Sequence, residues 1–255
     1  MKLIFSDLDG TLLHSDNSLS DSTLQAIKKV KAHGDLFIPI SSRLPSSIQS
    51  FIKQKAPLVA HNGAMIILKD QTISYTIDTQ AAYAICHYCD DLDWNIYDGD
   101  KWYSTNKYFK DHKIEEDYIG KTSIKITLED IKKIQTIHKI VCIGSIDSVV
   151  DDLEKHYPSL HITRSASYYL EITHHKATKA EALKTVASYY KIPLENTIAF
   201  GDYYNDEDML EIAGESYVVD NAPEDLKQKV DHITLSNDED GVAFILDHLY
   251  DKESF

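Results

Sequence analysis

The 255-residue chain is 43% hydrophobic and carries 26 Lys and Arg against 41 Asp and Glu, a formal net charge of −15. This apolar content is enough to bury the core of one large domain or two unequal ones without disulfide staples. Because the net charge is strongly negative and the positive residues are dispersed, the chain would repel a polyanion, and we expect no nucleic-acid partner. A small anion could still bind locally.

The cysteines and the apolar runs predict the cellular compartment. Cys86, Cys89 and Cys142 are an odd number in a long chain, which favours a reducing compartment over a disulfide framework. Cys86 and Cys89 lie in an apolar helical pattern without a second pair, so helix packing is favoured over a zinc site. The N-terminal apolar run is too short for a signal peptide, and no stretch of 18 apolar residues occurs. We expect a cytoplasmic protein without membrane contact, and no protein partner is identifiable.

Strand and helix patterns alternate near both ends of the chain. An apolar segment at 2–6 is followed by helical spacing over 23–32 and by a second apolar segment at 36–40. The same alternation returns in the last third of the chain, with helices predicted at 179–190, 207–212 and 223–230 and strands at 197–200 and 217–219. Repeated strand and helix units of this kind predict a parallel sheet covered by helices.

The middle of the chain has a different pattern, because its strands often follow one another without a helix between them. Strands are predicted at 94–97, 124–128, 140–143, 160–163 and 168–172, and helices near 81–92 and 148–156. We therefore predict an α/β protein with a discontinuous core, residues 1–80 plus 178–255, and an inserted α+β domain, residues 81–177.

The strongest chemical signal is Asp7-Leu8-Asp9-Gly10-Thr11, directly after the first predicted strand. The carboxyl end of a parallel strand is where such sheets bind ligands. Two carboxylates that face one cavity repel each other and require a cation, and Mg²⁺ fits best because it prefers hard oxygen ligands. One carboxylate can attack phosphorus while a second transfers protons, and Asp7 and Asp9 suit these two roles.

A second acidic cluster, Gly201–Asp208, follows the strand at 197–200. The carboxyl ends of parallel strands open on the same side, so Asp202 can complete the oxygen shell begun by Asp7 and Asp9. Asp206 could join that shell or support its ligands from behind. Taken alone, such a cluster is more often a solvated helix N-terminus, so the prediction of a metal site depends on both motifs together.

Two further positions could contact a phosphoryl group. Ser41-Ser42-Arg43 follows the strand at 36–40, and its hydroxyls could hold phosphate oxygens, although the same residues would serve as a helix cap. Lys179 begins a helix, where a fixed ammonium could offset the charge on the phosphoryl group. Asn62-Gly63 closes another apolar segment and could be a hairpin turn alone.

Together these motifs resemble the haloacid dehalogenase superfamily, specifically the Cof-type phosphatases with a large cap domain inserted between the second and third motifs. The resemblance covers essentially the whole chain. It implies a Rossmann-like doubly wound parallel sheet as the core, with the inserted α+β domain as the cap, and a phosphatase that uses Mg²⁺ as cofactor. The partner it implies is a small phosphorylated metabolite, with sugar phosphates as the leading class.

The resemblance also implies a role for each site residue. Asp7 matches the nucleophile and Asp9 the general acid/base, while Ser41 matches the phosphate-binding hydroxyl and Lys179 the lysine of the third motif. The remaining positions match the fourth motif, in which Asp202 is a metal ligand beside Asn205 and Asp206. Where the family commonly has Thr-Gly-Arg, this chain has Ser41-Ser42-Arg43. Serine keeps the hydroxyl, but the loss of the glycine affects how closely substrate and backbone approach.

Two other functions remain open at the level of sequence. In a phosphomutase, the aspartyl-phosphate would pass its phosphoryl group to a sugar hydroxyl, and the motif around Asp7 does not separate this reaction from hydrolysis. A catalytically silent module that binds a phosphorylated metabolite could keep the same fold. All the acidic groups needed for catalysis are present, which favours an enzyme.

Overall fold

The computed structural model describes residues 1–105, 113, 116, 119–166 and 168–251. The chain divides into two compact units, each with its own sheet and core. Unit 1 comprises Met1–Ser42, Ile48–Thr72 and Thr178–Phe255, and unit 2 comprises Arg43–Ser47 and Ile73–Ala177.

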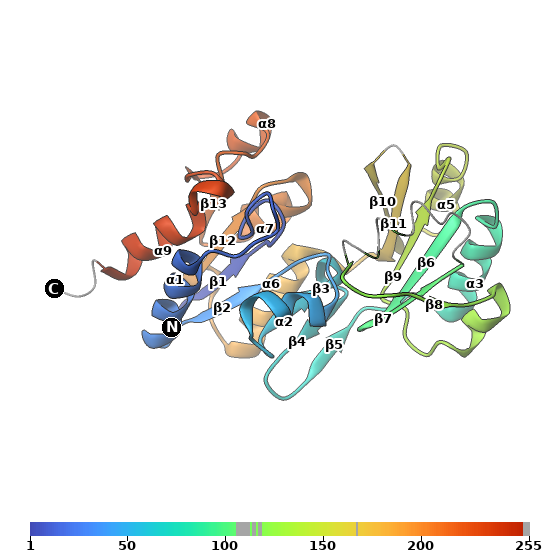
Figure 1. Cartoon of the computed structure of the whole chain (residues 1–255), viewed down its shortest axis with the longest axis horizontal. Coiled ribbons are helices and arrows are strands. Elements are labelled where there is room, and N and C mark those ends of the chain that lie inside the picture. Colours follow the sequence, from blue (N-terminus) through green and yellow to red (C-terminus); the bar gives the residue numbers. More distant parts are fainter. Residues whose placement is uncertain (106–112, 114–115, 117–118, 167, 252–255) are drawn as a thin grey trace. The chain divides into compact units, whose positions relative to one another are not determined.

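A five-stranded parallel sheet forms the centre of unit 1 (Figure 1). Its strands, in spatial order, are β14 (His232–Ile233), β13 (Glu215–Val218), β12 (Thr197–Gly201), β1 (Leu3–Ser6) and β2 (Leu36–Pro39). Ile4 packs into a core cluster with residues of α1 (Asp21–Ala32) and α9 (Gly241–Asp251). Leu3 and Phe5 point to the opposite face and are also fully buried. Both faces of the sheet are therefore covered, which explains the nearly continuous apolar runs of its strands.

The longer helices of unit 1 begin at residues that cap them. The side chain of Ser20 accepts a hydrogen bond from the Thr23 N–H at the start of α1, and Thr178 caps α6 (Lys179–Tyr190) in the same way. The other helices of this part of the chain are α2 (Pro45–Ile52), which spans the division between the units, α7 (Glu207–Ile212) and α8 (Glu224–Lys227).

A small antiparallel sheet follows α2. Its strands are β3 (Leu58–Ala60), β4 (Met65–Ile67) and β5 (Thr72–Ser74). The 3₁₀ turn η1 (His61–Gly63) joins β3 to β4, so Asn62 and Gly63 do close an antiparallel hairpin.

Unit 2 contains a six-stranded mixed sheet with helices packed on one face. The strands, in spatial order, are β10 (Leu160–Ala166), β11 (Tyr169–His174), β9 (Lys139–Ile143), β6 (Asp93–Asp98), β7 (Lys101–Ser104) and β8 (Ile124–Lys125). The pairs are antiparallel except β7 with β8. Residues of α3 (Thr79–Tyr88) and α5 (Val150–His156) share one apolar cluster with the sheet. The three cysteines lie in this cluster as buried free thiols.

The predicted fold class is confirmed: a parallel α/β sheet and a separate α+β unit are both present. Strand β7, whose four residues follow β6 after a two-residue turn, was not predicted from the sequence. The short strands β4, β5 and β14 and the helix α9 were not predicted either. The role of unit 2 as a cap stays a prediction. In the described part of the chain, no helix has both the length and the apolar character needed to cross a bilayer.

Unit 2 offers a stability test, because both tryptophans of the chain, Trp94 and Trp102, lie in its sheet. The buried Trp102 Nε1–H donates to Asn95 Oδ1 at 2.9 Å. Replacing Asn95 with Ala removes this acceptor, and we expect the free energy of unfolding of unit 2 to fall by about 1–3 kcal/mol. Urea unfolding followed by tryptophan fluorescence measures it. In a Trp102→Phe background the donor is absent, so Asn95→Ala should lower the free energy of unfolding by less. An equal loss of unfolding free energy in both backgrounds would contradict the prediction.

Candidate active site

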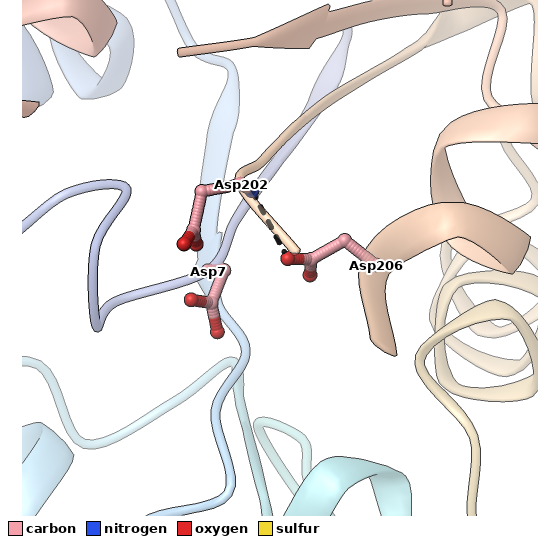
Figure 2. Close-up of side chains that lie close together, drawn as sticks. All are labelled: Asp7, Asp202 and Asp206. Carbon is pink, nitrogen blue, oxygen red and sulfur yellow. Dashed lines mark hydrogen bonds between the residues drawn. The ribbon is translucent and has the colours of Figure 1, made fainter. Parts of the chain in front are cut away.

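Two acidic segments meet where β1 and β12 end. The strands are neighbours in the parallel sheet, and the Asp7 N–H continues their ladder by donating to the Phe200 carbonyl at 3.0 Å. Asp7 follows β1 directly, and Asp202 follows β12. One carboxylate oxygen from each of Asp7, Asp202 and Asp206 lies within 4.8 Å of the others (Figure 2). The expectation that both strand ends open on one side of the sheet is therefore met.

Lys179 places a buried ammonium among these carboxylates. It is the first residue of α6 and only 1% exposed, and its Nζ lies 2.6 Å from both Asp7 Oδ1 and Asp206 Oδ1. The preceding residue, Thr178, packs against Gly63, where a Cβ would come within 2.4 Å of the Thr178 carbonyl oxygen. The start of α6 is therefore fixed by its cap and by this close backbone contact.

Both oxygens of Asp206 already face donors of the protein. Oδ1 accepts from Lys179, and Oδ2 accepts from the backbone N–H groups of Asp202 and Tyr203 at 3.1 and 3.2 Å. The Asp206 side chain is fully buried, and a Cβ added at Gly201 would lie 2.5 Å from the Cβ of Asp206. Asp206 thereby connects the lysine to the turn that carries Asp202.

Asp202 is held from the loop that follows β1. Thr11 Oγ1 donates to Asp202 Oδ1 at 2.7 Å. Gly10 has a φ of +82° and lies so close that a Cβ would come within 2.5 Å of Asp202 Oδ2. A residue with a side chain would be strained there by both its backbone conformation and this contact. The glycine and the threonine of the D-x-D-G-T motif therefore both serve to place the Asp202 carboxylate.

Asp9 and Ser41 form a second pair at the same edge of the sheet. Ser41 Oγ lies 3.5 Å from Asp9 Oδ2, and Ser41 is fully buried. The Ser41 backbone accepts from the Asn62 N–H at 2.9 Å and donates to the Val59 carbonyl at 3.0 Å. The Asp9 carboxylate is not one of the three that cluster around Lys179.

The remaining predicted residues lie in different surroundings. Ser42 is half-buried at the end of the first segment of unit 1, whereas Arg43 is buried in unit 2, where its Nη1 lies 3.4 Å from Ser47 Oγ. Asn205 is exposed in the 3₁₀ turn η4 (Tyr204–Asp206). The roles of these three residues in phosphate binding stay predictions.

Burial dominates the electrostatics of the cluster. Desolvation raises the pKa of Asp7 well above its usual range, against the opposing effect of Lys179, and raises the pKa of Asp202 to about 6 with a further contribution from Asp206. Burial alone would lower the pKa of Lys179, but the charges of Asp206 and Asp7 outweigh it and raise that pKa. These raised pKa values show that the carboxylates lack enough positive charge around them, and the oxygen-rich set suits a hard divalent cation.

Two residues that support the site, Thr11 and Asn62, could not be assigned this role from the sequence. Thr11 was part of the quoted motif, yet its bond to Asp202 joins residues 191 positions apart. Asn62 was read as a turn residue, but its backbone also holds Ser41. Their signal in the sequence was their place beside a glycine, Gly10 for Thr11 and Gly63 for Asn62.

Comparison with known proteins identifies the family of the chain. The profile of the haloacid dehalogenase-like hydrolases matches residues 4–246. A putative phosphatase of Haemophilus influenzae is 33% identical, over 98% of this chain and 98% of its own. The 5-amino-6-(5-phospho-D-ribitylamino)uracil phosphatase YwtE of Bacillus subtilis is 29% identical, again over 98% of each chain.

Solved structures share the whole fold. A Thermotoga maritima protein superposes with a TM-score of 0.86 at 25% identity, over 97% of each chain. A structure described as a HAD subclass IIB sugar phosphatase superposes with a TM-score of 0.82 at 21% identity, over 98% of each chain, and this likeness shows the fold alone.

The chain therefore belongs to the haloacid dehalogenase-like hydrolase family. Within that family it is a phosphatase of the Cof type, as the resemblance over the whole chain implied.

The raised pKa of Asp202 predicts how the metal-free protein responds to pH. Its pKa is about 6 in the folded state against 3.8 as the reference, so between these values the native state binds more protons than the unfolded state. The contribution of Asp202 to stability is therefore largest at acidic pH and falls as pH rises from about 4 to about 6. Thermal melts in chelator over this range, comparing wild type with Asp202→Asn, should show the variant gaining relative stability as pH rises.

The control for this measurement is Asp151→Asn, which changes an exposed carboxylate of α5. Its melting temperature should follow that of the wild type across the range. A constant offset between wild type and Asp202→Asn would contradict the assigned electrostatics.

Proposed function

We propose that the chain is a Mg²⁺-dependent phosphatase that hydrolyses a small phosphorylated metabolite through an aspartyl-phosphate on Asp7. The observation that carries the proposal is the buried ion cluster, in which Lys179 contacts Asp7 and Asp206 at 2.6 Å beside Asp202. A nucleophilic carboxylate and a phosphate are both anionic, so their approach requires positive charge at the point of contact. The cluster supplies the ammonium and the oxygens to hold a cation.

Asp7 and Asp202 are the carboxylates best placed to hold Mg²⁺, and Asp9 is proposed to complete the set. When bound, the ion would neutralise charge on the phosphoryl oxygens and on Asp7. Asp206 acts through its neighbours, because both of its oxygens are engaged by Lys179 and by the turn at Asp202. Its proposed role is to keep the ammonium charged and the turn in place.

In the proposed reaction, an Asp7 carboxylate oxygen attacks phosphorus and the ester P–O bond breaks. Asp9 gives a proton to the departing alkoxide, so an alcohol leaves. Asp9 then removes a proton from water, whose oxygen attacks the acyl phosphate, and the P–O bond to Asp7 breaks to release inorganic phosphate. Lys179 and the Ser41 hydroxyl hold the charged phosphoryl oxygens, and Ser42, Arg43 and Asn205 are the further phosphate contacts that we predict.

The proposed substrate is a phosphate monoester of a polyhydroxylated carbon chain, as in a sugar phosphate. This rests on the family resemblance and on the relative YwtE, whose name specifies a phosphorylated ribityl group. The rest of the substrate would be recognised by unit 2 acting as the cap.

Replacing Asp7 with Asn tests the chemistry most directly. Phosphate release from sugar phosphates, nucleotides and an aryl phosphate should require Mg²⁺, stop in chelator, and fall at least about a thousandfold in the variant, because an amide cannot form the acyl phosphate. Asp208→Asn, which changes a carboxylate of α7 outside the cluster, should stay close to wild type. Formation of an isomeric sugar phosphate would indicate a mutase, and wild type without turnover would indicate a silent module.

A second prediction concerns the cation. Calorimetric titration with Mg²⁺ at pH 7.5 should show one binding site. Loss of an outer hydrogen-bond partner of a metal site typically lowers metal affinity about 10- to 100-fold, and Asp202→Asn should lower the Mg²⁺ affinity by more than that. The reason is that the variant loses a direct oxygen ligand. Unchanged Mg²⁺ affinity in Asp202→Asn, with Asp208→Asn as the control, would rule out the proposed ligand set.

A further inference from the structure

A short segment near the C-terminus holds the loop that follows the nucleophile strand. The segment 236–240 contains the 3₁₀ turn η5 (Asn237–Glu239), which is closed by a capping box between Ser236 and Glu239. Three of its side chains bond to the stretch from the end of β1 into the first turn of α1: Asn237 to the Leu13 carbonyl, Asp238 to Ser15 N–H and Oγ, and Asp240 to His14, Ser20 and Thr23. These contacts join residues more than 200 positions apart.

Asn237 of this segment and Asn221, which precedes it by 16 positions, together reach the catalytic motif. The Asn237 backbone N–H donates to Asn221 Oδ1 at 3.0 Å, and Asn221 Nδ2 donates to the Gly10 carbonyl at 2.8 Å. The buried Asn237 side chain donates in turn to the Leu13 carbonyl at 2.9 Å. The backbone N–H can only donate and the two carbonyls can only accept, so the orientation of both side-chain amides is determined.

The two carbonyls lie in the loop that places the Asp202 carboxylate. The Leu12 and Leu13 N–H groups donate to the Leu8 carbonyl at 3.0 and 2.8 Å, which closes this loop on itself. Gly10 packs directly on Asp202, and the next residue, Thr11, donates to it. A shift of the peptide between Gly10 and Thr11 would therefore move the support of Asp202.

We infer that Asn221 and Asn237 form a hydrogen-bond relay that positions the Asp7–Leu13 loop and, through Gly10 and Thr11, the Asp202 carboxylate. The inference rests on the proposed function, because it assigns the relay to the same site. Neither asparagine touches the carboxylate cluster in this arrangement. They are positioning residues that act through the backbone of the motif.

Three measurements test the relay in Asn221→Ala and Asn237→Ala. Without metal or substrate, hydrogen exchange of the Leu12 and Leu13 amides should accelerate about five- to tenfold, the value of one lost hydrogen bond, while the amides of β13 are unchanged. Affinity for Mg²⁺ alone should fall about tenfold, as for loss of an outer partner of a metal site. At saturating Mg²⁺, kcat should fall about 10- to 100-fold with little change in KM, as expected for a misplaced reacting group.

The matched control is Asp238→Ala, which removes two bonds to the exposed end of the same loop at Ser15 and should leave all three quantities close to wild type. The effect of the double variant Asn221→Ala with Asn237→Ala should be smaller than the sum of the two single effects, because both side chains hold the same loop. Asn237→Asp removes the same donor to Leu13 with a side chain of nearly unchanged size, and like Asn237→Ala it keeps the backbone N–H for Asn221, so both variants should behave alike.

Equal effects of Asp238→Ala, additive effects in the double variant, or faster exchange without weaker Mg²⁺ binding would each overturn the relay. Exchange and Mg²⁺ binding do not depend on turnover. If wild type shows no phosphatase activity while both quantities respond as expected, the proposed function fails and the relay stands.

Discussion

The structure of the site depends on one buried positive charge. A lysine ammonium that is 1% exposed is costly to bury, and it is stable here because two carboxylates contact it at 2.6 Å. Asp7 arrives at the end of β1, Asp206 from the turn after β12 and Lys179 at the start of α6. Each element must end or begin at the right residue for the charges to meet. The contact of Lys179 with Asp7 and Asp206 therefore requires the sheet register, the Thr178 cap and the turn at Asp202 together.

Close backbone contact is the second feature that these groups share. At the site, glycine stands at three points where a Cβ would come within 2.4 to 2.5 Å of another atom: Gly10 at Asp202, Gly63 at Thr178 and Gly201 at Asp206. The main chain is thus tightly packed at the site, and the Asp206 carboxylate is held by two backbone N–H groups in addition to Lys179. In a chain with a formal charge of −15, such fixed donors concentrate positive potential where the acidic groups lie closest.

Sequence patterns predicted the parts of this arrangement that are encoded locally. The helix at Lys179–Tyr190 and the ends of β1 and β12 follow from apolar periodicity, and the acidic motifs follow those strand ends. The strand β7 was missed because four residues after a tight turn carry little periodicity. Thr11, Asn221 and Asn237 could not be assigned from sequence, because their bonds join residues 191 to 224 positions apart and no local pattern encodes such pairs.

The long separation between β1 and β12 has a consequence for biosynthesis. The interior strand β1, Leu3–Ser6, pairs with Thr197–Gly201, so most of the polypeptide must be translated before that neighbour exists. The strands of unit 2 lie between them in the chain and leave the ribosome earlier. Only β2 is available early to pair with β1. High contact order of this kind slows folding. One edge of β1 stays unpaired while the nascent chain is completed, and chaperones protect unpaired apolar edges of this kind from aggregation.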